Sequence, residues 1–326
     1  MSAASGSRGV LTLGEALGVL RTRGIGSLAH ESDLVVGTGG AEGNVAVGLA
    51  RLGTPVTWLG RVGDDGLGAR VLRELRAEGV TVVASIDPGA PTGLLLKETP
   101  AAGRTVVTYH RAGSAGSRLS PADLERVDIV AYGLLHVTGI TPALSETARA
   151  TIDTAVDRAR AAGVPVSFDV NHRTSLWRDA GAASVAYRSI ARRADVVFAG
   201  ADEAALVAGM SETTDVVPAD LARAIAAELG PTEVVVKLGD AGAIALCDGG
   251  LAERAAVPVT VVDTVGAGDA FVAGYLAARL AGEPVVGRLD LAVRTGAAAC
   301  THPGDWEGSP TRRELDREVG TDPVRR

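Results

Sequence analysis

Short apolar runs recur along most of the chain and alternate with longer stretches that have helical spacing. The runs predict buried strands at residues 10–13, 55–59, 134–137, 164–168, 196–199 and 233–238, with residues 243–247 as an antiparallel addition. The longer stretches, rich in Ala and Leu, predict helices at residues 42–52, 67–78, 145–162, 202–208, 218–228, 270–280 and 285–300. This alternation predicts an α/β fold with a doubly wound, mostly parallel sheet.

One segment breaks the alternation. Residues 92–97 and 104–111 are extended runs separated by Pro100-Ala-Ala-Gly103, which predicts a β-hairpin outside the main sheet. The stretch 21–37 lacks helical periodicity and is expected to pair with the hairpin. We interpret segments 21–37 and 92–111 as a small β lid; an immobile hairpin at the sheet edge is the alternative.

No internal repeat or low-complexity linker divides the chain. Residues 10–319 are therefore predicted to form one domain, with residues 1–9 and 320–326 as disordered tails. A net charge of −7 among 326 residues, with no basic run interleaved with aromatics, argues against a nucleic-acid partner. Two cysteines, no apolar run of about 18 residues and no signal-like N-terminus favour a cytoplasmic protein without a membrane partner.

The segment from Asp263 to Phe271, Asp-Thr-Val-Gly-Ala-Gly-Asp-Ala-Phe, places a glycine turn and a carboxylate where an apolar helix begins. Gly266 and Gly268 let backbone N–H groups turn toward an anion, and the helix adds the positive end of its dipole. Asp269 is then placed to accept a proton from a hydroxyl that attacks a phosphoryl group. An N-capping Asp after an ordinary tight turn is the alternative. No Gly-Lys-Ser/Thr sequence is present, which argues against a P-loop.

Two long patterns occur together in this chain. Residues 39–53 (Gly-Gly-Ala-Glu-Gly-Asn-Val-Ala-Val-Gly-Leu-Ala-Arg-Leu-Gly), followed by residues 60–66 (Gly-Arg-Val-Gly-Asp-Asp-Gly), resemble the N-terminal signature of the ribokinase-like (PfkB) family of sugar kinases. Residues 263–271 resemble its C-terminal signature. Segments 109–117, 136–144, 168–177 and 304–308 are most similar to the 2-keto-3-deoxygluconate kinases of that family.

The resemblance implies an enzyme that transfers the γ-phosphoryl group of ATP to a primary hydroxyl, with Mg²⁺ bridging the phosphates and a homo-oligomer formed through the lid. Asp269 is expected to be the base, with the N–H groups of Gly266, Ala267 and Gly268 as the anion hole. Asp263 matches a position that orders this loop, through a monovalent cation in some relatives; a turn-capping Asp is the alternative.

For the acceptor, the resemblance implies hydrogen bonds to sugar hydroxyls from the backbone of Gly39 and Gly40 and from the amide of Asn44. A capped glycine turn is the alternative reading of these residues. Asp305 resembles a position that touches the sugar from the C-terminal side, and an ordinary loop Asp is its alternative.

Arg111 closes the predicted hairpin, and Arg173 follows a strand at the end where doubly wound folds bind ligands. Guanidinium groups suit bidentate recognition of a carboxylate, which a neutral sugar would not need. Both arginines, and Tyr109, match the acid-sugar kinase pattern, although solvated surface arginines are the alternative in this arginine-rich chain.

The nucleotide side has fewer markers. Lys237, Gly239 and Gly242 resemble the family's nucleotide loop, and Gly266 and Gly268 are expected to contact the phosphates. Lys237 closes an apolar strand and needs a partner, for which a phosphate is one candidate and a structural contact another.

Two positions depart from the family pattern. Gly200 stands where an Asn begins an Asn-x-x-Glu motif for magnesium and phosphate, which leaves Glu203 as an indirect metal residue. Leu95 replaces a tyrosine near the substrate. The sequence thus predicts a kinase for 2-keto-3-deoxygluconate, with a neutral-sugar kinase of the ribokinase or fructokinase type, or a non-catalytic sugar-binding regulator, as alternatives.

Overall fold

The computed structural model describes residues 8–101, 104–210 and 216–317, and it confirms the doubly wound sheet. Nine strands form the main sheet in the order β13-β12-β11-β10-β9-β8-β1-β4-β5. From β11 to β5 all neighbours are parallel, and β12 and β13 are added antiparallel, as expected for residues 243–247. The strand bounds are β1 Val10–Leu13, β4 Val56–Gly63, β5 Thr81–Asp87, β8 Leu134–Thr138, β9 Val166–Asp169, β10 Val196–Gly200, β11 Glu233–Lys237, β12 Ala243–Cys247 and β13 Gly250–Arg254.

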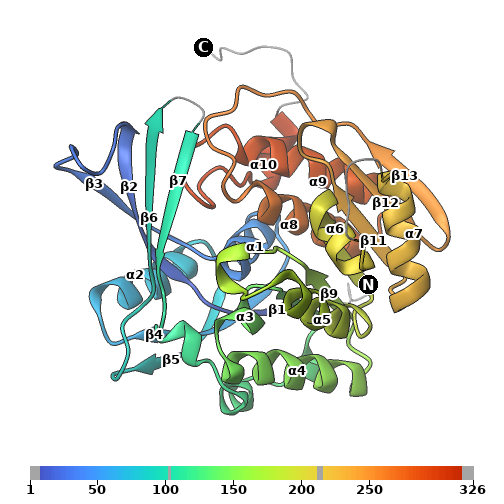
Figure 1. Cartoon of the computed structure of the whole chain (residues 1–326), viewed down its shortest axis with the longest axis horizontal. Helices are drawn as coiled ribbons and strands as arrows, with labels where there is room; N and C mark the ends of the chain where they lie inside the picture. The colour runs from blue at the N-terminus through green and yellow to red at the C-terminus, as the bar shows by residue number, and fades with distance from the viewer. Residues whose placement is uncertain (1–7, 102–103, 211–215, 318–326) are drawn as a thin grey trace, which may run out of the picture.

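Helices cover both faces of this sheet (Figure 1). Residues of α4 to α7 pack in one hydrophobic cluster, and residues of α1, α2, α8, α9 and α10 pack in the other. The helix bounds are α1 Ala41–Arg51, α2 Gly66–Ala77, α3 Thr141–Leu144, α4 Glu146–Ala161, α5 Ala180–Ala191, α6 Ala201–Ala208, α7 Pro218–Leu229, α8 Ala267–Leu280, α9 Val285–Ala299 and α10 Arg312–Arg317.

Successive strand residues point into opposite clusters, which explains the uninterrupted apolar runs. In β8, Leu134 packs on the α8 side while Leu135 and Val137 pack on the α4 side. In β10, Val196 and Phe198 pack on the α8 side, and the residues that follow each of them, Val197 and Ala199, pack on the α4 side. Because both faces are buried, a polar side chain in these strands finds water or a ligand only at a strand end.

The segments interpreted as a lid form a second sheet that stands apart from the main sheet (Figure 1). We call this sheet the lid, and its motion stays a prediction. It is a four-stranded sheet in the order β3-β2-β6-β7, with bounds β2 Leu17–Ile25, β3 Leu34–Gly39, β6 Leu94–Ala101 and β7 Arg104–His110. The predicted hairpin and its pairing with the 21–37 stretch are both confirmed, although β6 continues through Pro100, which was expected in the connection. Leu17, Val19 and Leu95 form a small core on its inner face.

Some expectations were incomplete. The edge strands β5 and β13 and the helices α3, α5 and α10 were not predicted, and α8 begins three residues before the expected start of 270. Residues 1–7 and 318–326, which cover most of the predicted tails, lie outside the described residues. Within the described part of the chain, no helix is long and apolar enough to cross a membrane; the cytoplasmic location stays a prediction.

The buried sheet centre makes a direct stability prediction. Leu135 in β8 is 0% exposed, so Leu135→Ala should lower the free energy of unfolding by about 2–5 kcal/mol through lost burial and a cavity. Urea denaturation followed by circular dichroism measures it. Val185→Ala, at a position 71% exposed in α5, is the control and should stay within about 0.5 kcal/mol. Equal midpoints for the two variants would contradict the assigned burial.

Candidate active site

The loop before α8 is built around Gly266. This residue caps α8 with φ 78°, and a Cβ there would overlap the carbonyl oxygen of Asp305. Only glycine therefore fits both the left-handed backbone and the close approach. The N–H of Ala267 makes a 3.3 Å hydrogen bond to the carbonyl of Thr264. The N–H groups of the first helical turn have no partner within α8. The positive end of the helix therefore lies at Gly268, where it can act on an anion.

Asp269 lies in the first turn of α8 and is 7% exposed. Its carboxylate accepts hydrogen bonds from the amide of Asn44 at 2.8 Å and from the amide of Asn171 at 3.3 Å. Burial raises the pKa of Asp269 to about 7, with the carboxylate of Asp169 adding to the rise and the Asn44 hydrogen bond opposing it. A carboxylate that exchanges its proton near neutral pH is suited to general-base chemistry.

The turn before α1 lies beside this carboxylate. Gly40 has φ 127°, and a Cβ there would overlap the carbonyl oxygen of Glu15. A Cβ on Gly39 would overlap the carboxylate of Asp305, which brings these two expected acceptor-site residues into contact. The side-chain oxygen of Asn44 is buried and has no hydrogen-bond partner among the described residues. Such an orphaned acceptor fits a hydroxyl donor from a ligand.

Arg111 is paired within the protein. Directly after β7, its guanidinium binds the carboxylate of Glu15, with Nε donating at 2.6 Å, and lies 5.1 Å from the ring centre of Tyr109. Glu15 is 0% exposed at its side chain and also accepts a hydrogen bond from Ser114. The positive charge of Arg111 is therefore already balanced by a buried carboxylate.

Arg173 differs from Arg111. It is exposed, and among the described residues its guanidinium has no hydrogen-bond or ion-pair partner. Burial is the largest influence on the pKa of Asp169 and of Asp269 and raises both, and the charge of Arg173 acts in the opposite direction on each. Arg173 therefore lies within electrostatic range of the base. This cation is available to an anionic ligand.

Lys237 ends β11, and its ammonium binds the carboxylate of Asp169 at 2.7 Å. Burial alone would lower the pKa of Lys237, but the carboxylates of Asp169 and Glu203 outweigh burial and hold that pKa above its usual value. The expected partner of this lysine is thus a carboxylate in the structure. Lys237 still lines the neighbouring cavity, where its charge can also act on a ligand.

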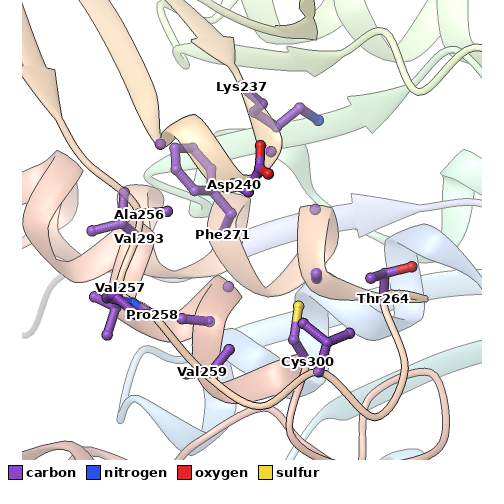
Figure 2. A pocket seen from close by; sticks show the side chains of 17 residues that line it. Lys237, Asp240, Ala256, Val257, Pro258, Val259, Thr264, Phe271, Val293 and Cys300 are labelled. Atoms are coloured by element: carbon purple, nitrogen blue, oxygen red, sulfur yellow. The ribbon is translucent and has the colours of Figure 1, made fainter. Parts of the chain in front are cut away.

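A cavity of about 580 Å³ adjoins the start of α8 (Figure 2). Lys237, Gly239, Gly242 and Gly268 line it together, as expected for the nucleotide side. Figure 2 shows Lys237 at one side and the loop of Val257, Pro258 and Val259 at the other. Further apolar lining comes from Phe271, Val293, Ala297 and Cys300, among others. A cavity with an apolar end and an end with a cation and helix N–H groups suits a molecule with a flat apolar part and an anionic part.

The two expected metal residues have protein partners. Glu203 accepts hydrogen bonds from the N–H groups of His172 and Gly200, both at 2.7 Å. Asp263 accepts from the N–H of Val265 at 3.2 Å, which is the turn-capping alternative, and it also pairs with Lys97. Across the described ranges, no group of three or more His, Cys, Asp or Glu could hold a metal ion by itself. A magnesium ion here would be held mainly by ligand phosphates and water.

Four residues of the site were not predicted from the sequence. They are Glu15, Lys97, Asp169 and Asn171. Asp169 ends β9 and Asn171 follows it, so the strand-end argument that selected Arg173 also applies to them. Asn171 has φ 39°, a left-handed conformation that asparagine tolerates.

Comparison with known proteins decides the family. A model of the pfkB family of carbohydrate kinases matches residues 10–312. The chain belongs to this family. It is therefore a sugar kinase, a phosphotransferase with an alcohol acceptor, and the resemblance and fold expected from the signatures are confirmed.

Relatives and solved structures span nearly the whole PfkB chain. A 2-dehydro-3-deoxygluconokinase of Bacillus subtilis (strain 168) is 38% identical over 310 residues, covering 94% of this chain and 93% of the relative. A fructokinase of Klebsiella pneumoniae is 36% identical, covering 89% and 94%. A putative ribokinase II from E. coli in complex with ATP and Mg²⁺ superposes with a TM-score of 0.84 at 26% identity, covering 96% and 99%. A Vibrio cholerae O395 fructokinase double mutant, with fructose, ADP and potassium bound, has a TM-score of 0.83 at 26% identity, covering 96% and 98%.

The pKa of Asp269 predicts the pH dependence of turnover. A base must be ionised to accept a proton, so kcat/KM for the acceptor should fall about tenfold per pH unit below a pKa of about 7. Asn44→Ala removes a hydrogen bond that favours the ionised form, so its acid limb should move to higher pH. If the nucleotide were the titrating group, Asn44→Ala would not move the acid limb of the pH profile. An acid limb at the wild-type position would therefore exclude Asp269 as the titrating group.

Proposed function

We propose that this PfkB kinase transfers the γ-phosphoryl group of ATP to a primary hydroxyl of a sugar acid, most specifically 2-keto-3-deoxygluconate, also called 2-dehydro-3-deoxygluconate. The observation that carries the proposal is the guanidinium of Arg173, which has no partner among the described residues and lies within electrostatic range of Asp269. A base at the positive end of a helix supports phosphoryl transfer, and a cation within electrostatic range of that base supports an anionic acceptor. The similarity to the Bacillus subtilis relative points to the same substrate class.

The cavity beside α8 supports ATP as the donor. Its apolar wall suits an adenine ring, while Lys237 and the N–H of Gly268 suit phosphates. The N–H of Gly266 lies at the cap of the same helix, whereas that of Ala267 already bonds to the carbonyl of Thr264. Magnesium bound to those phosphates would neutralise part of their charge. The solved neighbour from E. coli that contains ATP and Mg²⁺ supports this assignment.

In this proposal the described side chains have separate roles. The oxygen of Asn44, buried without a partner, accepts a hydrogen bond from the acceptor sugar, and the backbone of Gly39 and Gly40 lines the same turn. Asp269, oriented by the amides of Asn44 and Asn171, takes the proton of the attacking hydroxyl. Helix N–H groups stabilise negative charge on the transferring group.

The carboxylate end of the acceptor depends chiefly on Arg173. Glu15 already balances the charge of Arg111, so an acidic sugar would have to share that guanidinium with a buried protein carboxylate. Arg111 can still donate from a nitrogen not bound to Glu15, beside the ring of Tyr109. The contribution of Arg111 to acid recognition is therefore expected to be smaller than that of Arg173.

A neutral-sugar kinase is the second candidate, and the pairing of Arg111 with Glu15 is the observation that favours it. The 36% identity to a fructokinase agrees with this alternative. Leu95 packs against Leu17 and Val19 in the core of the lid, so this position offers no polar group to an acidic sugar.

Replacement of Arg173 separates the two candidates. Losing a charge-assisted hydrogen bond costs roughly 1.5–3 kcal/mol, so Arg173→Ala should lower kcat/KM for 2-keto-3-deoxygluconate by about 10–150-fold and leave fructose phosphorylation nearly unchanged. Coupled assays of ADP release with both acceptors measure it.

Arg178→Ala is the matched control, because Arg178 is an exposed arginine five residues further along the same loop. Asp269→Asn provides the blank, since loss of a general base should lower kcat by about 10²–10⁴-fold. A wild-type enzyme that prefers fructose to every sugar acid would exclude the acid-sugar assignment, and one that turns over no acceptor would favour the regulator.

We also infer that the lid joins two copies of the chain. Val36, Leu20 and Leu96 lie opposite one another across β3, β2 and β6, on the face turned away from Val19 and Leu95. Val36 is 37% exposed, and a contiguous aliphatic row on a sheet face favours burial against a partner.

Sedimentation velocity tests the lid contact. Val36→Glu places a charge in the aliphatic row and should shift the wild-type dimer toward monomer, because an unpaired charge is costly to bury. Val185→Glu, on the exposed surface of α5, is the control and should leave the sedimentation coefficient unchanged. A wild-type monomer at micromolar concentration would contradict the proposed contact.

A further inference from the structure

Lys97 is a buried cation that connects the lid to the loop before α8. It lies in β6 and is 3% exposed, and its ammonium has three oxygen partners. These are the carboxylate of Asp263, the carbonyl oxygen of Gly304 at 3.3 Å and the carboxylate of Asp305 at 3.5 Å. An ammonium has three N–H groups and no acceptor, so this set uses its full donor capacity.

The partners of Lys97 are the groups that shape the phosphoryl-transfer site. Asp263 holds the turn through the N–H of Val265 and also accepts from the N–H of Gly304. The carbonyl of Asp305 lies against Gly266, and its carboxylate lies against Gly39. A single ammonium thus links the lid, the loop before α8 and the acceptor turn.

The local charge explains why a cation is needed at this point. Asp263, Asp305 and Glu307 bring three carboxylates together, and burial raises the pKa of Asp305 to about 6, an effect that the charge of Lys97 opposes. Without the ammonium, two buried carboxylates would face each other with no counter-charge. Like charges in such a place repel and disorder the backbone that carries them.

We infer that the ammonium of Lys97 is the resident cation of this loop and takes the place of a monovalent metal ion. Two carboxylates and a backbone carbonyl are oxygen donors of the kind that such an ion binds, and all three already have Lys97 as their partner. A monovalent ion at Asp263, expected from the family resemblance, therefore does not fit beside Lys97. Lys97 is a positioning residue, since it acts on the transferring group only through Asp263, Asp305 and Gly266.

The origin of Lys97 in the lid adds a second consequence. An ion from solution would order the loop before α8 in any position of the lid. The ammonium of Lys97 orders this loop only when β6 is packed against the main domain. The anion hole and the lid therefore form one unit. Removing the charge should affect kcat more than the KM for the nucleotide, because the cavity walls do not include Lys97.

The wild-type protein gives the first test. Turnover and thermal midpoint are measured in potassium chloride and in tetramethylammonium chloride at equal ionic strength, the latter cation being too large for the loop. We expect kcat to agree within about twofold and the midpoints within about 1 °C, since an ion that does not bind cannot stabilise the fold. Tenfold activation by potassium would overturn the inference.

Three variants give the second test. Lys97→Met keeps the aliphatic stem and removes the charge, and it should lower kcat by about 10–150-fold, with potassium or ammonium ions restoring part of kcat and raising the thermal midpoint. Lys97→Arg should retain most of kcat because the charge remains. Arg104→Met, which removes an exposed charge from β7 of the same lid, is the control.

Unchanged kcat in Lys97→Met, or no ion-specific rise in its thermal midpoint, would overturn the inference. If Lys97→Met does not fold, Lys97→Arg and the wild-type comparison still decide it. The inference depends on the phosphoryl transfer common to PfkB kinases and not on the acid-sugar assignment. The thermal midpoints require no acceptor, so a failure here is distinct from a failure of the proposed substrate.

Discussion

Burial of the main sheet on both faces is the constraint from which the site follows. Side chains of β8 and β10 alternate between two apolar clusters, so a polar group within these strands would lose its hydration. Charged residues of β9 and β11 therefore lie at strand ends, and at the carboxyl ends Asp169 closes β9 and Lys237 closes β11. Because parallel strands end at one edge of the sheet, residues far apart in the chain are brought together there by the strands themselves.

At this edge of the sheet, several charged side chains are held in ion pairs, and within the part of the chain that the structure describes Asp269 is not. Asp169 is matched by Lys237, and Glu15 by Arg111, so these charges are fixed in place. Among the described residues, Asp269 has only neutral amides as hydrogen-bond partners, and burial raises its pKa to about 7. A buried carboxylate without a direct ionic partner is thus able to exchange a proton during a reaction.

The sequence predicted those features that depend on neighbours along the chain. Apolar runs located the central strands, and glycines with Asp269 located the start of α8, because local backbone chemistry specifies both. β5 was missed because its apolar run, residues 82–84, is short and only partly buried at the sheet edge. The pairing of Arg111 with Glu15 joins residues 96 apart, and Lys97 reaches a carbonyl 207 residues away. No local pattern encodes such contacts, which arise only when the lid packs on the body.

Lysine is so scarce in this chain that its reactivity is confined to the site. Lys97 and Lys237 are the only two in the sequence, and each contacts an aspartate beside the phosphoryl-transfer loop. The solvent-facing positive charge is carried by arginine, whose guanidinium does not react as an amine nucleophile. Acylation of lysine side chains, whether by a reagent or by a cellular acetylating enzyme, can therefore modify this protein only at the residues that organise its chemistry.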